Sequence, residues 1–190
     1  VPRNEWPAIV QSIKPAWRKN LPQAPTTDLP VSRLAPLTAR FIEDDVLGNT
    51  GVFVIKRDAI MAMGGFDESL EVGEDVYLWI QLADRIGSML FVHRPLMLYR
   101  HRPGSLTNQD YPAHAFFAEK FFGALARQQA FAPYRPLIRF RINRALKQQC
   151  YYFRRVRQHA KAIAAIAKAL GQRPLDRESW RNLIACLILQ

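Results

Sequence analysis

The strongest hydrophobic pattern in the chain lies in residues 74–87, where apolar side chains recur every three or four positions. These side chains are Val76, Leu78, Trp79, Leu82, Ala83 and Ile86. This spacing places them on one face of a helix, and Gly87 follows the last of them. The pattern therefore predicts an amphipathic helix over 74–87 that ends at the glycine.

Two shorter elements are predicted upstream of this helix. The run GVFVIKR at 51–57 is rich in β-branched and aromatic residues, which predicts a buried strand. The run DAIMAMGG that follows predicts one or two helical turns, with Asp58 as the cap and Gly64 and Gly65 as the stop.

Downstream, the pattern predicts one more strand region and then helices only. The segment 88–102 reads as a strand or two, broken at Pro95. Helical spacing then continues through three segments, near 112–130, 136–170 and 176–189. The order of strand, helix, strand and helices predicts an α/β fold, with part of a sheet layer followed by an all-helical C-terminal extension.

Composition sets wide bounds on the protein class. With 190 residues, 49% of them hydrophobic, the chain is long enough to bury a core. No apolar run reaches the ~18 residues that would span a bilayer. Cys150 and Cys186 lie far apart without metal-type spacing, which predicts two buried, reduced thiols in a cytosolic protein.

Positive charge is concentrated in the second half of the chain. Residues 1–99 contain 10 Lys and Arg against 12 Asp and Glu, whereas residues 100–190 contain 17 against 4. Such asymmetry is typical of contact with nucleic acid, phospholipid headgroups or a phosphorylated substrate, and equally of a solvated basic helical surface. Between 136 and 170, arginines alternate with aromatic residues, which predicts one long helix with an apolar stripe and a basic face.

Glu74 and Asp75 stand where the main predicted helix begins, directly after Gly73. Two interpretations of this acidic pair are open. A helix N-terminus carries unpaired amide donors and the positive end of the helix dipole, so the pair can simply cap the helix. Alternatively, an ionised carboxylate there points into a cleft and removes a proton from a hydroxyl, and Gly73 permits a close backbone approach or a positive φ.

Three motifs in a fixed order extend the second interpretation: GGFDE from residue 64, ED with LW over 74–79, and YR with GSLT over 99–107. Together they resemble the second half of the catalytic domain of family 2 glycosyltransferases, which are inverting enzymes. The resemblance covers residues 41–108. It implies a partial GT-A-like (Rossmann-like) sheet layer there, between a proline-rich lead-in over 1–40 and a basic helical extension over 109–190.

The resemblance also assigns roles to the acidic pair and to the helix that follows it. It implies that Asp75 is the general base that deprotonates the acceptor hydroxyl, and that Glu74 helps to bind the acceptor. Trp79 stands where the family has a helix aromatic on the acceptor side, and a core anchor is the alternative interpretation of this residue.

The glycine turn is implied to shape the acceptor side of the same pocket. Gly65, Phe66 and Asp67 match it, together with Gly64. Asp67 is also typical of a residue that forms a turn, and this is the alternative interpretation of its side chain.

The donor side is less complete in this sequence. The resemblance implies that His101 or Arg102 faces the donor diphosphate, His101 as a metal ligand or Arg102 as a cation in its place; two surface side chains are the alternative. A divalent metal, Mg or Mn, is expected for the complete enzyme. The acidic cluster at 43–45 is expected to be a solvated turn rather than the metal-binding DxD of the family. The nucleotide-binding half is expected to lie outside this sequence, so that the chain alone is not expected to turn over.

The resemblance thus implies an inverting glycosyltransferase of hexosyltransferase type in cell-surface polysaccharide assembly. The QxxRW motif of processive members is absent, so one sugar per visit is expected. Expected partners are a nucleotide-sugar donor, a glycan or lipid-linked acceptor and, in peripheral contact, an anionic membrane at the cytoplasmic face. The alternatives are a non-catalytic basic helical module that binds anionic lipid or nucleic acid, for which the chain has no recognised motif, and an inactive truncated remnant.

Overall fold

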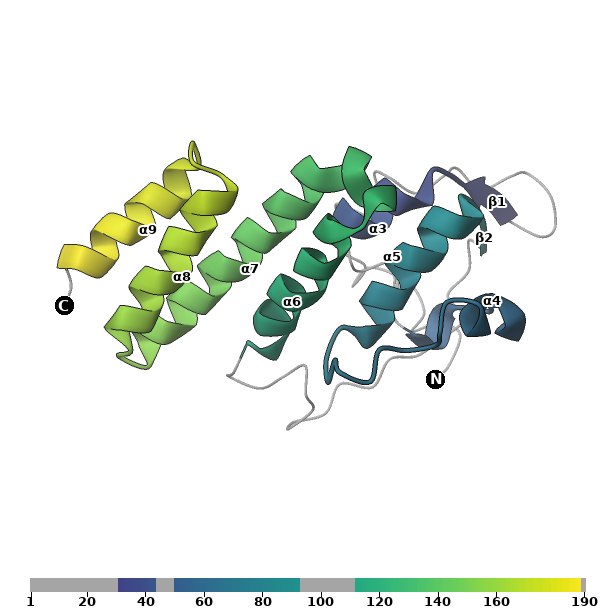
Figure 1. Cartoon of the computed structure of the whole chain (residues 1–190), viewed down its shortest axis with the longest axis horizontal. Coiled ribbons are helices and arrows are strands. Elements are labelled where there is room, and N and C mark those ends of the chain that lie inside the picture. The colour runs from purple at the N-terminus through teal and green to yellow at the C-terminus, as the bar shows by residue number, and fades with distance from the viewer. Residues whose placement is uncertain (1–30, 44–49, 93–111, 189–190) are drawn as a thin grey trace, which may run out of the picture.

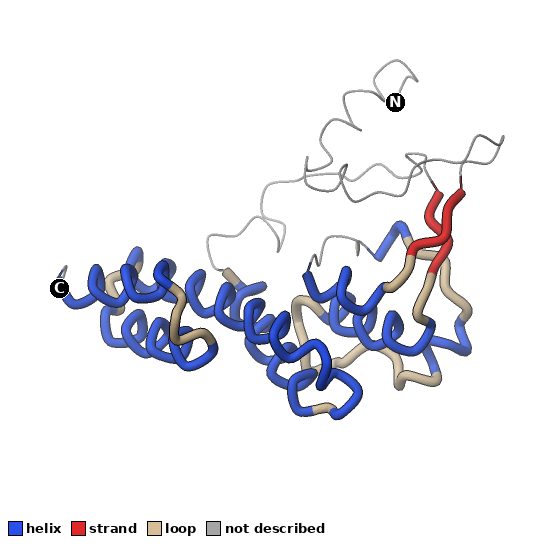
Figure 2. The backbone as a smooth tube through the Cα atoms, turned by 90° about the horizontal axis from the view of Figure 1, so that it is seen from above, coloured by secondary structure: helices blue, strands red, loops and turns tan. Residues whose placement is uncertain are grey.

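The structure is a computed structural model that describes residues 31–43, 50–92 and 112–188. These residues form a row of helices with a small sheet at one end and α9 (Arg177–Ile188) at the other (Figure 1). Figure 2 shows the same row from above, with the two strands standing out at the end opposite the C-terminal helices. Among the described residues, no helix has the length and apolarity to cross a membrane.

The sheet of the described residues consists of two antiparallel strands, β1 (Val31–Leu34) and β2 (Met89–Val92). β2 confirms the strand predicted at the start of 88–102, and the rest of that segment lies outside the described residues. β1 lies in the range 1–40 that the sequence assigned to a lead-in, so the end of that range is part of the folded unit. The described fold is therefore mostly helical, with a smaller sheet than the predicted α/β layer.

The strand predicted at 51–57 is wrong. Thr50–Val52 form a short 3-10 helix, η3, the next residues are irregular, and α4 (Arg57–Met61) begins soon after. The side chains do alternate, because Phe53 and Ile55 pack against the core while Val54 is fully exposed. This is the two-residue period of a strand, but no described segment pairs with it. The period alone therefore could not distinguish a strand from an extended segment.

The short helix predicted after that segment is confirmed as α4. It begins after Lys56, and Asp58 lies in its first turn rather than at the cap. Gly64 and Gly65 both have positive φ, and the Gly65 N–H donates to the Ile60 carbonyl at 3.1 Å. The two glycines thus end the helix, as the sequence predicts.

The amphipathic helix is confirmed as α5 (Glu74–Ile86), with Gly87 as its left-handed C-cap. Its buried face packs against α3 (Leu37–Glu43), which buries Phe41 and Ile42 in the same core. The buried side chains of α5 are Leu78, Trp79, Ile80, Leu82 and Ala83. Ile86 is half-exposed, so the apolar face of α5 is covered except at its last turn.

The helical extension is a set of antiparallel neighbours: α6 (Ala113–Arg127), α7 (Arg135–Arg155), α8 (His159–Gln172) and then α9. The 3-10 helix η5 (Gln129–Tyr134) joins α6 to α7. α7 packs against α6 on one side and α8 on the other. Three small buried residues of α8 let it approach α7 closely, namely Ala162, Ala165 and Ala169.

The single helix predicted over 136–170 is therefore wrong. The chain reverses between α7 and α8, where Arg157 adopts a left-handed φ of 57°. The Gln158 N–H donates to the Phe153 carbonyl at 2.8 Å and closes the end of α7. A glycine or asparagine is usual at such a position and would have indicated a helix end. Because the residue is an arginine, the sequence did not indicate this reversal of the chain.

The thiols predicted to be buried are buried. Cys150 of α7 and Cys186 of α9 are both free and 1% exposed, with their sulfur atoms 3.6 Å apart. Burial raises the pKa of the Cys150 thiol to about 12, and the hydrogen bond with Cys186 adds to the shift. The pair thus packs as two small apolar groups that fasten α9 to α7.

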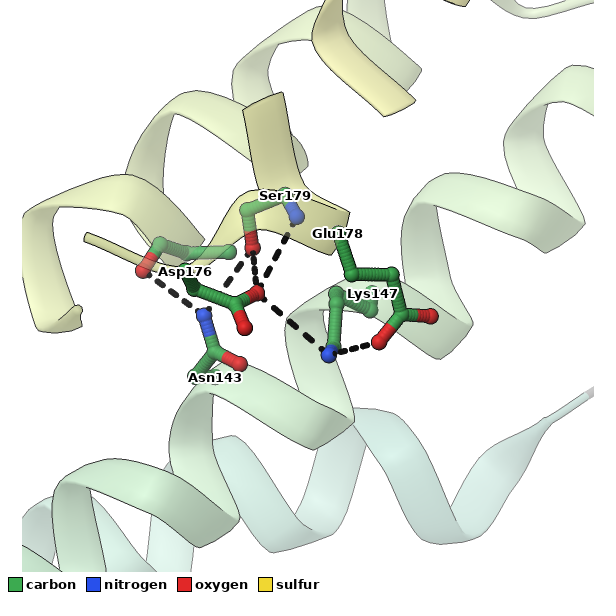
Figure 3. Close-up of polar contacts among 6 residues, drawn as sticks. Asn143, Lys147, Asp176, Glu178 and Ser179 are labelled. Carbon is green, nitrogen blue, oxygen red and sulfur yellow. Dashed lines mark hydrogen bonds and ion pairs between the residues drawn. The ribbon is translucent and has the colours of Figure 1, made fainter. Parts of the chain in front are cut away.

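A buried polar network joins α7, α8 and the start of α9 (Figure 3). The Asn143 side-chain amide donates to the Ala169 carbonyl at 3.0 Å and to the Ser179 hydroxyl at 3.1 Å. Asp176 caps α9, because its Oδ2 accepts from the Ser179 backbone N–H at 3.0 Å and from the Ser179 hydroxyl. Lys147 forms ion pairs with Asp176 and Glu178. One asparagine and one cap thus act together with the cysteine pair to fix the position of the last helix.

Replacing Asn143 by Ala is expected to lower the free energy of unfolding by about 1–3 kcal/mol, because the buried Ala169 carbonyl and Ser179 hydroxyl lose their donor. Chemical denaturation of both proteins measures this difference. Gln148→Ala, on the exposed side of α7, is the matched control and is expected to change the free energy by less than about 0.5 kcal/mol. Equal effects of the two substitutions would contradict the assigned role.

The stabilisation from the Asp176 cap is expected to be lost at low pH. Burial raises the pKa of Asp176, but the hydrogen bonds from Ser179 and the charge of Lys147 outweigh it, so the pKa lies below its ordinary value of 3.8. Because folding lowers this pKa, the ionised carboxylate stabilises the fold at pH values above 3.8. This contribution disappears as the pH falls through the pKa of the folded state. The difference in unfolding free energy between the native protein and Asp176→Asn should therefore be largest near neutral pH and shrink in acid. A difference that stays constant into acid would contradict this prediction.

Candidate functional site

The acidic pair lies at the first two positions of α5. Gly73 is the N-cap, with a left-handed φ of 84°, and Glu74 and Asp75 follow it as the first helical residues. Asp75 Oδ1 accepts a hydrogen bond from the Val76 N–H at 2.7 Å. One carboxylate oxygen therefore does serve the helix N-terminus, in line with the capping interpretation.

The other oxygen of Asp75 lies toward a different segment of the chain. Asp75 Oδ2 accepts a hydrogen bond from the Thr50 hydroxyl in η3 at 3.1 Å. Asp75 is half-buried as a residue, and the two hydrogen bonds fix the direction of its carboxylate. Sequence reasoning missed Thr50, which lies 25 residues upstream and carries no motif of its own. Asp75 is thus held by one backbone donor and one hydroxyl.

Glu74 is arranged differently from its neighbour. Its side chain is half-buried, and it forms no hydrogen bond or ion pair with the part of the chain that the structure describes. A carboxylate at a helix N-terminus is favoured there by the helix dipole without a partner of its own. Its carboxylate oxygens thus have no hydrogen-bond donor or cation among the described residues.

Three aromatic rings pack together beside the start of α5. Trp79, one turn after Asp75, lies with its ring centroid 4.8 Å from that of Phe53 and 6.2 Å from that of Phe66, the latter edge-on. Trp79 is 4% exposed, and its indole nitrogen has no hydrogen-bond partner among the described residues. Its packing is that of a core anchor. Phe66 is 41% exposed and covers one edge of the tryptophan.

The GGFDES turn, residues 64–69, is held by its own hydrogen bonds and by α6. Asp67 Oδ1 accepts from the Ser69 N–H at 2.9 Å, and the Ser69 side chain and backbone together lower the pKa of Asp67. The Lys120 ammonium donates to the Ser69 carbonyl at 2.9 Å and to its hydroxyl at 3.1 Å. Asp67 is exposed and acts in the turn, as the alternative interpretation of this residue states.

Gly73 connects this turn to α5 under two constraints. Its φ is one that side-chain-bearing residues rarely adopt. In addition, a Cβ at this position would lie 3.0 Å from Cε1 of the Phe121 ring. The sequence proposed a close approach or a positive φ at Gly73, and the structure shows both.

The donor side of the predicted site is not covered by the structure. His101, Arg102 and two residues of the acidic cluster, Asp44 and Asp45, lie outside the described residues. Within residues 31–43, 50–92 and 112–188, no group of three or more His, Cys, Asp or Glu side chains is placed to hold a metal ion. The described residues thus bring together Asp75, Glu74 and the aromatic rings, but no donor or metal site.

Comparison with known proteins gives one match. The family model described as "Glycosyltransferase like family 2" matches residues 27–164. This range contains the sheet, the acidic pair, α6, α7 and the beginning of α8, and it extends beyond the predicted range 41–108 on both sides. No curated protein and no solved structure matches the chain.

Replacing Gly73 by Ala is expected to destabilise the protein by about 1–2 kcal/mol from the left-handed backbone alone, and by more where Phe121 cannot move aside. Thermal or chemical unfolding measures the loss. Gly171→Ala is the matched control, because Gly171 is helical with open space around it; it is expected to be neutral or stabilising. Equal stabilities of the two variants would contradict the assigned constraint.

Proposed function

This chain belongs to the glycosyltransferase-like family 2, and from that premise we propose that it transfers a sugar from a nucleotide-sugar donor to a hydroxyl of a glycan or lipid-linked acceptor. We propose that transfer inverts the anomeric carbon and adds one sugar per visit. The proposed setting is cell-surface polysaccharide assembly at the cytoplasmic face of the membrane.

The geometry of Asp75 is the observation that carries this proposal. One oxygen of its carboxylate is fixed by the Val76 N–H, while the other lies 3.1 Å from a hydroxyl, that of Thr50. The Thr50 hydroxyl thus shows that Oδ2 can accept a hydrogen bond from an alcohol at normal distance. An acceptor hydroxyl that binds at Oδ2 would take the place of Thr50 or lie beside it.

The proposed step follows from this position. Asp75 Oδ2 takes the proton of the acceptor hydroxyl while the hydroxyl oxygen forms a bond to the anomeric carbon of the donor. The bond from that carbon to the diphosphate breaks on the opposite face, and the nucleoside diphosphate leaves with the electron pair. A general base within hydrogen-bond reach of the proton that it removes contributes about 10²–10⁴-fold to the rate.

The neighbouring residues support acceptor binding in this proposal. Glu74 is half-buried and has no described partner, so its carboxylate can accept from further acceptor hydroxyls. The exposed ring of Phe66 offers an apolar surface to the face of a sugar. Gly65, Asp67 and Trp79 would act indirectly, since the first two shape the turn and the third supports Phe66 from the core.

Donor binding remains a proposal from the family resemblance. His101 or Arg102 would face the diphosphate, with a divalent Mg or Mn ion. Their chemistry suits that role, because an imidazole is a metal ligand and a guanidinium pairs with phosphate oxygens. The proton transfer to Asp75 does not involve the metal.

Asp75→Asn is expected to lower sugar transfer by about 10²–10⁴-fold, because an amide cannot take up the proton. The assay measures release of nucleoside diphosphate and transfer of label from UDP-, GDP- and dTDP-sugars to a membrane lipid extract, with the natural full-length protein. The matched control is Asp84→Asn, on the exposed side of the same helix, which is expected to keep full activity. Asparagine can still accept from the Val76 N–H, so the thermal midpoint should change little. Transfer by Asp75→Asn at the native rate would overturn the base assignment.

A further inference from the structure

The last helix, α9, covers the end of the helical row and has two different faces. Its inner face packs on α8 and α7 through Ser179, Leu183 and Cys186. Figure 1 shows α9 at the extreme end of the row, with no described element beyond it. Its outer face is therefore open in the described structure.

This outer face is apolar. Trp180, Ile184, Leu187 and Ile188 recur at intervals of four, three and one, and they are 50%, 53%, 56% and 74% exposed. At 100° per residue, these four side chains share one side of the helix. Leu175, in the turn that leads into α9, is 94% exposed. We call these five residues the α9 apolar face.

Two arginines lie on the same side of the helix as this face. Arg177 and Arg181, one turn apart, are exposed, and helical geometry places them beside Ile184 and Ile188. The whole extension is basic, with 15 Lys and Arg against 3 Asp and Glu over residues 112–188. A helix that combines exposed tryptophan and aliphatic side chains with arginines is typical of one that lies in the plane of a membrane interface, where long arginine side chains reach toward the headgroups.

The tryptophan on this face can enter an apolar medium at low cost. Its indole N–H already donates to the Pro174 carbonyl at 2.7 Å, while half of the residue stays exposed. Burial of the exposed ring among lipid chains would thus leave no unpaired donor. Tryptophan is also a residue that favours the membrane–water boundary.

Charge argues against the other occupants of this face. A second copy joined through the same face would bring together two strongly basic extensions, each with 15 Lys and Arg against 3 Asp and Glu over residues 112–188, and like charges repel. Nucleic acid would match the arginines but not the exposed isoleucines and leucines, since its binding is dominated by phosphate contacts. An anionic bilayer matches both the charge and the apolar side chains.

We propose that the α9 apolar face is a membrane-docking surface, which inserts its side chains at the level of the headgroups of an anionic bilayer while Arg177 and Arg181 pair with lipid phosphates. The charge asymmetry of the sequence is typical of headgroup contact somewhere within residues 100–190, and the structure points to α9 within that range. This inference does not rest on the proposed sugar transfer, because binding is measured without donor or acceptor.

The test is co-sedimentation of the full chain with vesicles of neutral phosphatidylcholine and of phosphatidylcholine with about a third phosphatidylglycerol, the anionic fraction that attracts basic helices. The native protein is expected to bind the anionic vesicles at least tenfold more tightly than the neutral ones. Trp180→Glu with Ile184→Glu is expected to lower binding at least tenfold. Arg177→Gln with Arg181→Gln is expected to reduce the preference for anionic vesicles.

Tyr151→Glu is the matched control. Tyr151 is an exposed aromatic residue of α7, 68% exposed, and its replacement adds the same charge without touching α9. It is expected to lower binding much less than Trp180→Glu alone. Thermal unfolding of each variant shows that the fold is retained, which is expected because all the altered side chains are exposed.

A second measurement locates the tryptophan. Brominated lipids quench tryptophans that enter the bilayer, and the quenching is expected in the native protein and absent in Trp180→Phe, which still sediments with the vesicles. The proposal is overturned if the native protein does not bind anionic vesicles, if Trp180→Glu binds like the native protein, or if neutral vesicles bind equally well. It is also overturned if the chain is a dimer in solution that Ile184→Glu converts to a monomer without any vesicle binding.

Discussion

The contact between the Phe121 ring and Gly73 is the one on which the geometry of the candidate site depends. The ring occupies the space that a Cβ of residue 73 would need, so the chain can turn into α5 there only as glycine. Phe121 also lies against Tyr77 of α5 and against Phe122, which is fully buried in α6. The direction in which the Asp75 side chain points from α5 thus depends partly on α6. The sequence predicted a separate helical extension from residue 109, but α6 of that extension supports the candidate site. This agrees with the family match, which runs to residue 164.

Much of the fold could be predicted where the determining interactions are local. The period of apolar residues in α5 and the glycine after it lie within one short segment, and both were confirmed. The predictions of a strand at 51–57 and of a single helix over 136–170 were wrong for opposite reasons. At 51–57 the side chains alternate as in a strand, but pairing requires a distant partner. At Arg157 the chain reverses with neither glycine nor proline, and the tight packing of alanines in α8 against α7 compensates for an unusual backbone.

The candidate site could be predicted in part for the same reason. The acidic pair and its glycine are neighbours in sequence, and a helix N-terminus is recognisable from them. The hydrogen bond from Thr50 to Asp75 could not be predicted, because it joins segments that only the tertiary fold brings together. Trp79 belongs both to the apolar pattern of the helix and to the motif over 74–79. Its burial shows that packing in the core determines where its ring lies. Asp67 likewise serves its turn through Ser69.

The positive charge of the extension supports the proposed membrane-docking role of α9, which is separate from the packing of the helices on one another. α6, α7 and α8 bury alanine, leucine and phenylalanine side chains between them, and this apolar packing holds the three helices together. Figure 1 places α9 at the end of the row away from α5. A bilayer at the α9 apolar face would therefore leave Asp75 uncovered and in reach of a water-soluble donor. An acceptor carried on a lipid would then be brought to the same surface as the enzyme, where the search for it takes place in two dimensions rather than three. The intervening helices set how far its sugar must extend to meet the carboxylate.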